Sequence, residues 1–134
     1  EHFLKRMRNL EKNDYSGIIQ NAQMVIESCA KAIISCFAVV EWTHDPKKQL
    51  LEIIELQKEK VIQVFGEKMI EELKTLADDV EIAAPWHGKS VYGDFEKLIP
   101  AVELCTAEVA RDLSNRAERS FATSQKFYTG WFGL

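Results

Sequence analysis

Apolar residues recur at helical spacing along most of the chain, and the pattern is strongest between residues 18 and 40. At about 100° per residue, one line along a helix in this stretch carries only apolar or thiol side chains. These are Ile18, Ala22, Val25, Cys29, Ile33, Cys36 and Val40. Ile19, Ile26, Ala30 and Phe37 widen the stripe beyond half of the circumference. A helix with so broad an apolar face is expected at the centre of a bundle.

The same periodicity, read with the capping residues, predicts four further helices. Together with the central helix at residues 15–40, the expected helices are residues 1–12, 46–65, 67–77 and 106–129. Only six glycines and three prolines occur, which favours helices over many short strands. We therefore predict an all-α fold, an antiparallel up-and-down bundle of about five helices around the second one. The 134 residues suffice for a single domain, residues 1–134.

Helical periodicity is lost between residues 78 and 99. This predicts a long loop, because connections in compact domains seldom exceed about 12–15 residues unless they are functional. The chain after residue 129 ends in the apolar side chains of Trp131, Phe132 and Leu134. These side chains need cover, which predicts contact with a second copy of the chain.

The charge of the chain argues against a protein that binds nucleic acid mainly through phosphate contacts. The net charge is −4, with 17 Lys and Arg against 21 Asp and Glu. A protein of that class shows a basic footprint. No run of about 18 apolar residues is present, so no membrane span is expected.

Three cysteines, Cys29, Cys36 and Cys105, show no CxxC spacing. Two of them lie in the apolar stripe, where small thiols commonly pack in a core. We expect core packing rather than disulfide or metal roles. A reducing, cytoplasmic compartment follows from this expectation.

Motifs for catalysis are scarce in the chain. It has no P-loop, GxGxxG, HExxH or GxSxG pattern. His2, His44 and His87 are far apart in sequence and lack metal-ligand spacing. We therefore predict no catalytic residues, no metal and no cofactor.

A charge pair stands in the middle of the largely apolar segment of residues 18–34, with Glu27 four residues before Lys31. With the acid on the N-terminal side, such a pair stabilises a helix by about 0.2–0.5 kcal/mol. A helix-surface ion pair therefore explains why the two residues stand four positions apart, but it does not explain the pattern of residues around them.

The surroundings resemble the HEPN domain family. The segment NDYSGIIQNAQMVIESCAKAII, residues 13–34, is similar to the family's pattern of an acidic turn, Ala-Gln, a helical Glu and a later Lys-Ala. Glu27 and Lys31 fall on this pattern. THDPKKQLLEII at residues 43–54 resembles the His-Asp segment that opens the family's next helix, and HGKSVYGDFEKLIP at residues 87–100 extends the resemblance.

The resemblance implies an antiparallel helical bundle, usually dimeric, in cytoplasmic proteins of archaea and bacteria. Many members of the family are encoded beside a minimal nucleotidyltransferase, and others are ribonuclease toxins. The ribonucleases carry an Arg followed, after four to six residues, by a His. None of Arg6, Arg8, Arg111, Arg116 and Arg119 has a histidine at that distance. Ribonuclease activity is therefore not carried over.

In related members the loop before the last helix often reads Arg-Tyr and has been linked to nucleotides. This chain has Val91-Tyr92 there, and only Lys89 could offer a point charge to a phosphate. The candidate ligand or partner residues of the loop are His87, Lys89, Ser90, Tyr92 and Asp94. The alternative is that Trp86 and Tyr92 simply pack on the bundle.

The resulting hypothesis is a non-catalytic, dimeric HEPN-type module that binds a partner protein, namely a minimal nucleotidyltransferase in a pair of the toxin–antitoxin type. A nucleotide- or RNA-binding protein that uses the loop at residues 78–99 is the first alternative. A ribonuclease with a non-standard site is the second.

Overall fold

A computed structural model describes residues 1–10 and 14–134. The helices are α1 (His2–Asn9), α2 (Tyr15–Ser35), α3 (Lys47–Phe65), α4 (Glu67–Ala83), α5 (Trp86–Tyr92), α6 (Ala101–Leu104) and α7 (Ala107–Phe132). The described part of the chain has no strand and only one isolated β-bridge, between Asp94 and Ile99. The predicted all-α fold is confirmed. The two helices beyond the predicted five are short, and the expected end of the first helix, residue 12, lies outside the described residues.

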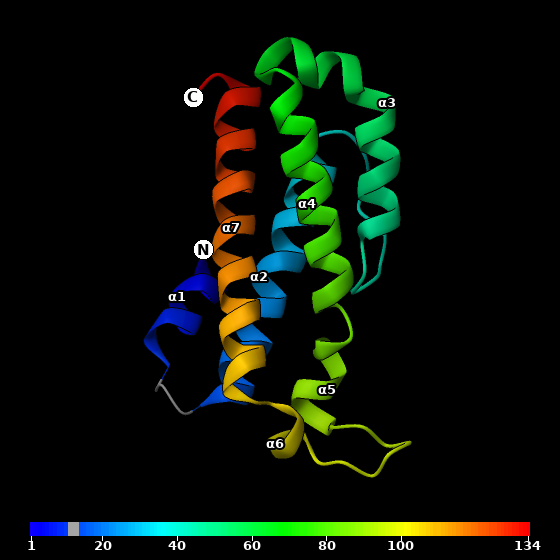
Figure 1. Cartoon of the computed structure of the whole chain (residues 1–134). Helices are drawn as coiled ribbons and strands as arrows, with labels where there is room; N and C mark the ends of the chain where they lie inside the picture. Colours follow the sequence, from blue (N-terminus) through cyan, green and yellow to red (C-terminus); the bar gives the residue numbers. More distant parts are fainter. Residues whose placement is uncertain (11–13) are drawn as a thin grey trace.

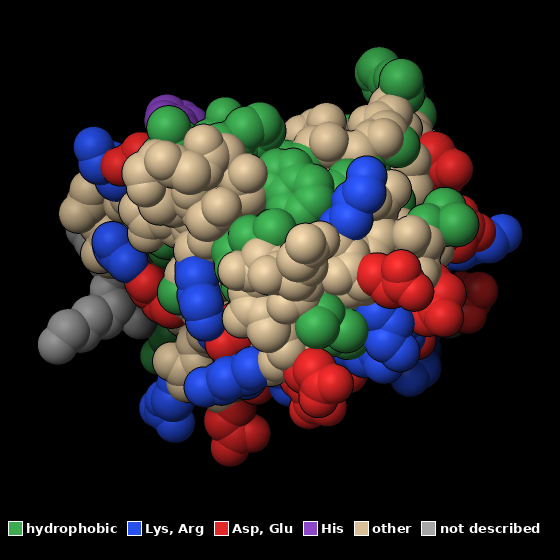
Figure 2. All heavy atoms as spheres, turned by 90° about the horizontal axis from the view of Figure 1, so that it is seen from above, with side chains coloured by type: hydrophobic (Ala, Val, Ile, Leu, Met, Phe, Trp, Pro, Cys, Tyr) green, Lys and Arg blue, Asp and Glu red, His purple; other side chains and the backbone are tan. Residues whose placement is uncertain are grey.

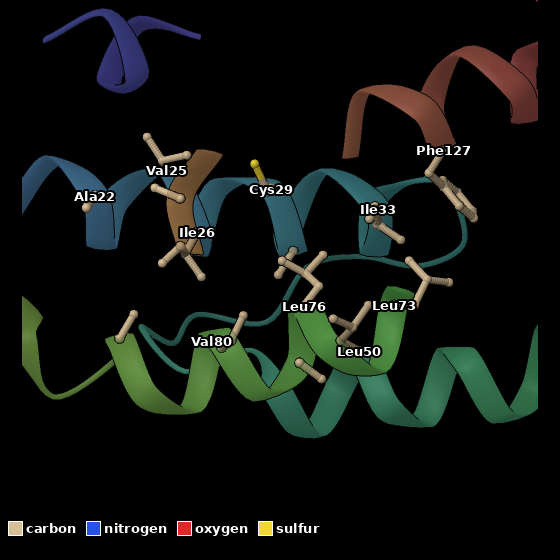
Figure 3. Close-up of a cluster of buried hydrophobic side chains, with 14 of the residues drawn as sticks. Ala22, Val25, Ile26, Cys29, Ile33, Leu50, Leu73, Leu76, Val80 and Phe127 are labelled. Atoms are coloured by element: carbon tan, nitrogen blue, oxygen red, sulfur yellow. The ribbon is translucent and has the colours of Figure 1, made fainter. Parts of the chain in front are cut away.

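Helix α2 occupies the centre of the bundle, as predicted, and contacts α1, α3, α4, α5 and α7 (Figure 1). Its apolar side chains meet those of the neighbouring helices in one continuous core (Figure 3). Asp14 caps the start of α2 by accepting a hydrogen bond from the Gly17 N–H at 3.1 Å. Burial on so many sides, rather than helix propensity alone, holds this helix in place.

The predicted end of the second helix at residue 40 is wrong, because α2 ends at Ser35. The β-branched Val39 and Val40 are poor helix formers, and Val39 is exposed. The segment of residues 36–46 then returns along the bundle, so that α3 begins beside the middle of α2 (Figure 1). Helix α4 packs antiparallel to α2, α3 and α7, whereas these three helices point the same way.

The predicted loop at residues 78–99 is wrong over its first part, where α4 continues to Ala83 and α5 follows. Buried residues Leu76, Val80 and Ala83 continue the apolar face of α4. The charged residues Asp78 and Asp79 interrupt the apolar pattern of this face in the sequence. Asp79 is only 1% exposed, yet the structure stabilises it in the interior through partners from α7.

Two guanidinium groups of α7 hold the Asp79 carboxylate. Arg116 Nη1 lies 2.7 Å from Oδ1, and Arg119 donates to both oxygens, at 2.6 and 3.2 Å. A buried carboxylate needs such partners, because an unpaired buried charge is strongly destabilising. This ion cluster ties α4 to α7 and explains why an Asp can occupy the interior there.

Helix α7 begins after Thr106, as predicted, with the Thr106 hydroxyl accepting from the Val109 N–H at 3.2 Å. Near its other end, the half-buried Trp131 packs on Phe37 and Phe127, with ring centroids 4.9 and 5.7 Å apart. Figure 2 looks onto this end and shows hydrophobic side chains gathered among polar and charged ones. Part of the apolar tail is therefore covered within the chain, while Phe132 and Leu134 stay exposed.

The three cysteines carry no disulfide. Cys29 and Cys105 are buried, and burial raises the pKa of the Cys29 thiol to about 11. The prediction of core packing is confirmed for these two, while Cys36 is half-buried at the end of α2. Within the residues described, no helix combines the length and apolarity that a membrane crossing requires.

We expect Ile33→Asp to unfold the domain. Ile33 is 2% exposed at the centre of the core, and an unpaired charge there costs on the order of several kcal/mol. Ser28→Asp is the matched control, because Ser28 is exposed on the same helix, and its effect should stay within about 0.5 kcal/mol. Urea unfolding followed by circular dichroism measures both. Equal stability of the two variants would show that this face of α2 is not buried in solution.

Candidate functional site

The most concentrated polar chemistry of the structure surrounds Glu27, which is buried on α2. Its Oε1 accepts from Gln23 Nε2 and lies 3.0 Å from His44 Nδ1. Its Oε2 accepts from Lys31 Nζ at 3.0 Å. Because Gln23, Glu27 and Lys31 are each four residues apart, a helix places them in one row. The fourth member, His44, comes from outside the helix.

His44 is held in place by the return segment of residues 36–46. The buried Gln49 of α3 clamps this segment by accepting from the Glu41 N–H at 3.0 Å and donating to the Val39 carbonyl at 2.8 Å. Asp45 then accepts from the Lys47 N–H at 3.3 Å, which shapes the start of α3. These contacts fix the backbone beside α2, and they leave the His44 ring over Glu27.

His87 joins the group from the first turn of α5. Its Nδ1 lies 3.2 Å from Gln23 Oε1, and its ring stacks on that of His44 with centroids 3.5 Å apart and an interplanar angle of 19°. Gln23 Nε2 is engaged with Glu27, so Gln23 Oε1 faces His87 as an acceptor. His87 Nδ1 therefore donates this hydrogen bond.

Two opposing effects act on the Glu27 carboxyl group. Burial acts to raise its pKa, because the charged form loses hydration. Hydrogen bonds from Gln23, Lys31 and His44, together with the positive charge of Lys31, outweigh burial, so the pKa of Glu27 lies below its ordinary value of 4.5. The group is therefore a carboxylate at neutral pH, and it is an acceptor for three different kinds of donor.

The cluster offers one carboxylate acceptor and two imidazole rings at a partly open surface. Glu27, His44 and His87 each offer one ligand atom, and these atoms lie within 4.8 Å of one another, a grouping that could hold a metal ion. Next to them, Lys31, Val40, Glu41, Trp42, Thr43 and His44 line a cavity of about 400 Å³. The spacing of the histidines along the chain predicts no such grouping, because residues 44 and 87 meet only in the folded protein.

The predicted pair of Glu27 and Lys31 is present as an ion pair, with Glu27 much more buried than a surface pair would be. The residues predicted from the region of residues 78–99 do not converge on one point. His87 joins the Glu27 cluster, while Lys89 lies 5.8 Å from the Trp86 ring centroid. A role of these residues in ligand binding stays a prediction.

The other three residues of that prediction have separate surroundings. Ser90 is buried, and its Oγ has no hydrogen-bond partner among the described residues. Tyr92 is exposed at the end of α5. Asp94 shapes a turn by accepting from the N–H groups of Glu96 and Lys97 at 3.1 and 3.2 Å.

Sequence reasoning missed Gln23 and His44 as members of the cluster. Gln23 could have been found, because it stands four residues before Glu27 in the row that also contains Lys31. His44 carries a weaker signal, its place in the THDP turn before α3. Its contact with Glu27 depends on the return of residues 36–46 along the bundle, which no periodicity indicates.

We expect Glu27→Ala to destabilise the fold by about 1–3 kcal/mol, because the buried Gln23 amide loses its acceptor. Lys31→Ala should cost less, about 0.2–1 kcal/mol, since the Lys31 side chain is partly solvated and leaves two donors on the carboxylate. Urea unfolding of both variants tests the order. Equal losses would mean that the ion pair, rather than the buried carboxylate, organises the cluster.

Comparison with known proteins places the fold and the cluster in context. A family model described as the HEPN domain matches residues 1–127, which includes every residue of the Glu27 cluster. No curated protein matches the chain, and no solved structure matches it either. Since the match covers nearly the whole chain, the protein belongs to the HEPN domain family.

Proposed function

We propose that this protein is a non-catalytic, homodimeric HEPN module that works by binding a partner protein, a small nucleotidyltransferase. The observation that carries the proposal is an apolar projection beside α5, formed by residues 91–102. Its large side chains Val91, Tyr92, Phe95, Leu98 and Val102 are all exposed. Figure 1 shows the connection between α5 and α6 extending away from the bundle.

The projection carries its exposed apolar side chains on one short segment, where they alternate with the charged side chains of Asp94, Glu96 and Lys97. Phe95 is 77% exposed and Leu98 is 86% exposed. Single apolar residues on a surface need no explanation, but several large ones exposed on one segment are typical of an interaction site. Covering such side chains contributes about 25 cal/mol per Å² of apolar surface. The projection therefore offers a partner a substantial hydrophobic gain.

The backbone of the projection is held in a defined conformation. Asp94 and Ile99 exchange hydrogen bonds of 2.8 and 3.0 Å. Gly93 has a φ of +77°, and a Cβ there would lie 2.3 Å from the Ile99 carbonyl oxygen. Only glycine suits that position. A loop that is already ordered loses little conformational entropy on binding, which favours a docking role.

The class of partner and the dimer are supported by family membership. HEPN domains commonly dimerise, and many relatives are encoded beside a minimal nucleotidyltransferase. At the end of the bundle opposite the projection, the exposed side chains of Tyr128, Phe132 and Leu134 offer a second apolar surface. We assign this second surface to the contact between two copies, which leaves the projection free for the nucleotidyltransferase.

We expect the double variant Phe95→Ser/Leu98→Ser to bind a nucleotidyltransferase encoded beside this chain at least about tenfold more weakly. The reason is the loss of the two most exposed large side chains around the turn at residues 94–99. Co-expression, followed by titration of the purified proteins, measures the affinity. Leu56→Ser is the matched control, since Leu56 is 80% exposed on α3 and should leave binding unchanged. Unchanged binding of the double variant, or no binding by the unaltered chain, would contradict the proposal.

A second candidate function is the binding of single-stranded RNA or a nucleotide at the Glu27 cluster. The observation that favours it is the cavity beside His44, where the fully exposed Trp42 ring stands near Lys31. An aromatic face and a cation are what stacking of a base and contact with a phosphate require. In this candidate function, the ligand binds at residues 36–46 instead of at the predicted loop, and His87 is the residue that belongs to both sites.

We expect no cleavage of single-stranded or transfer RNA by the purified protein, with or without divalent metal. The Nδ1 atoms of His44 and His87 are engaged by Glu27 and Gln23, the chain has no Arg at the spacing of the family's nucleases, and its net charge is −4. Gel analysis of labelled RNA tests this. Cleavage that disappears in His44→Ala and in His87→Ala but persists in His2→Ala would establish a ribonuclease with a non-standard site.

A further inference from the structure

Three segments that are distant in sequence bring metal-ligating side chains to one point. Glu27 comes from α2, His44 from the return segment of residues 36–46, and His87 from α5. Their ligand atoms lie within 4.8 Å of one another, and His44 Nδ1 is 3.0 Å from Glu27 Oε1. In the described part of the chain, no other group of His, Cys, Asp and Glu side chains converges in this way. The arrangement depends on the tertiary fold alone.

The types of ligand favour a divalent transition metal over Mg²⁺ or Ca²⁺. Imidazole nitrogen suits Zn²⁺ and its neighbours in the first row, whereas Mg²⁺ and Ca²⁺ prefer oxygen. Two histidines and one carboxylate form a three-ligand set that leaves a further position open. At metal–ligand bonds of about 2.0–2.2 Å, tetrahedral ligand atoms stand about 3.3–3.6 Å apart. The separation of His44 Nδ1 and Glu27 Oε1 is already close to this value.

The histidine rings have room to adjust. Their stacked arrangement, with centroids 3.5 Å apart, must open before both can ligate one ion. The His44 side chain is 59% exposed, so it can turn about its own bonds without disturbing the core. The cavity of about 400 Å³ beside His44 gives an ion and its waters access from solvent. Glu27, by contrast, is fixed by the surrounding core and supplies the stationary ligand.

Gln23 supports two members of the group at once. Its Nε2 donates to Glu27, and its Oε1 accepts from His87 Nδ1. Outer-shell partners of this kind orient metal ligands and fix the tautomer of a histidine. Gln23 is buried, so it acts as a positioning residue and not as a ligand.

Lys31 opposes the metal. Its ammonium group lies on Glu27 Oε2 and supplies a positive charge to the carboxylate when no metal is bound. Like charges at this range repel, so an incoming cation must tolerate or displace the ammonium group. Removing the Lys31 charge should therefore strengthen metal binding, which is a directional test that chance binding to a surface histidine would not meet.

We propose that Glu27, His44 and His87 bind one divalent first-row transition-metal ion of the Zn²⁺ class, with Gln23 as the positioning residue. The site goes beyond the docking function of the projection, because it uses different residues on a different part of the surface. Its role is to cross-link α2, the return segment and α5, while an open position remains for water or another ligand.

The test is titration of the full chain with Co²⁺ and Zn²⁺. We expect a saturable one-to-one visible absorption spectrum with Co²⁺, displaced by Zn²⁺, and a Zn²⁺ enthalpy with the same stoichiometry. Each of His44→Ala, His87→Ala and Glu27→Gln should weaken binding by about tenfold or more. His2→Ala is the matched control, because His2 is exposed on α1 outside the cluster, and it should bind like the unaltered chain. Lys31→Gln should bind several-fold more tightly.

Circular dichroism of each variant in the absence of metal separates lost binding from lost folding. Because His44 is exposed and His87 is half-exposed, their alanine variants should keep the helical fold. Absence of one-to-one binding by the unaltered chain would overturn the proposal. Binding that persists in His44→Ala or His87→Ala, or that disappears in His2→Ala, would overturn it as well. Unchanged binding by Glu27→Gln, or weaker binding by Lys31→Gln, would contradict the three-ligand arrangement.

Discussion

The enclosure of α2 by five other helices is the constraint on which the rest of the structure depends. A helix surrounded in this way can expose few of its own polar side chains, so those that it carries must find partners within the protein. Glu27 is the strongest case, because its carboxylate is buried and ionised. Gln23 and Lys31 on the same helix cannot saturate it alone. The return segment supplies His44, and α5 supplies His87 to Gln23, so the polar cluster is a consequence of how the core is closed.

A second buried carboxylate shows a different solution to the same constraint. Asp79 on α4 is held by Arg116 and Arg119, whose guanidinium groups fit a carboxylate closely. Guanidinium groups have no lone pair to offer to a metal, so the two arginines of this cluster can only donate hydrogen bonds. Around Glu27 the donors are an amide, an ammonium group and an imidazole, of which the imidazole is itself a ligand once its proton is replaced. The two buried carboxylates therefore differ in their partners, because only the Glu27 cluster includes side chains that are themselves metal ligands.

The Glu27 cluster and the apolar projection are connected through α5. This short helix carries His87 in its first turn, and its last two residues, Val91 and Tyr92, begin the apolar projection of residues 91–102. The polar cluster is built on α2, whereas the connection between α5 and α6 extends away from the bundle (Figure 1). Helix α5 therefore contributes residues both to the polar cluster and to the projection.

The sequence by itself determined the helical class, the central position of α2, the start of the last helix near residue 106, and the pairing of Glu27 with Lys31. All of these depend on contacts between residues a few positions apart, which periodicity and spacing record directly. It could not determine that α4 runs through Asp78 and Asp79, because that helix needs arginines from α7 to hold its buried carboxylate. Nor could it bring His44 and His87 together, since their stacking depends on where residues 36–46 return and where α5 packs. Interactions between residues close in sequence can be predicted from residue spacing. The site, in contrast, is formed by contacts between distant segments, and only the tertiary structure decides which segments meet.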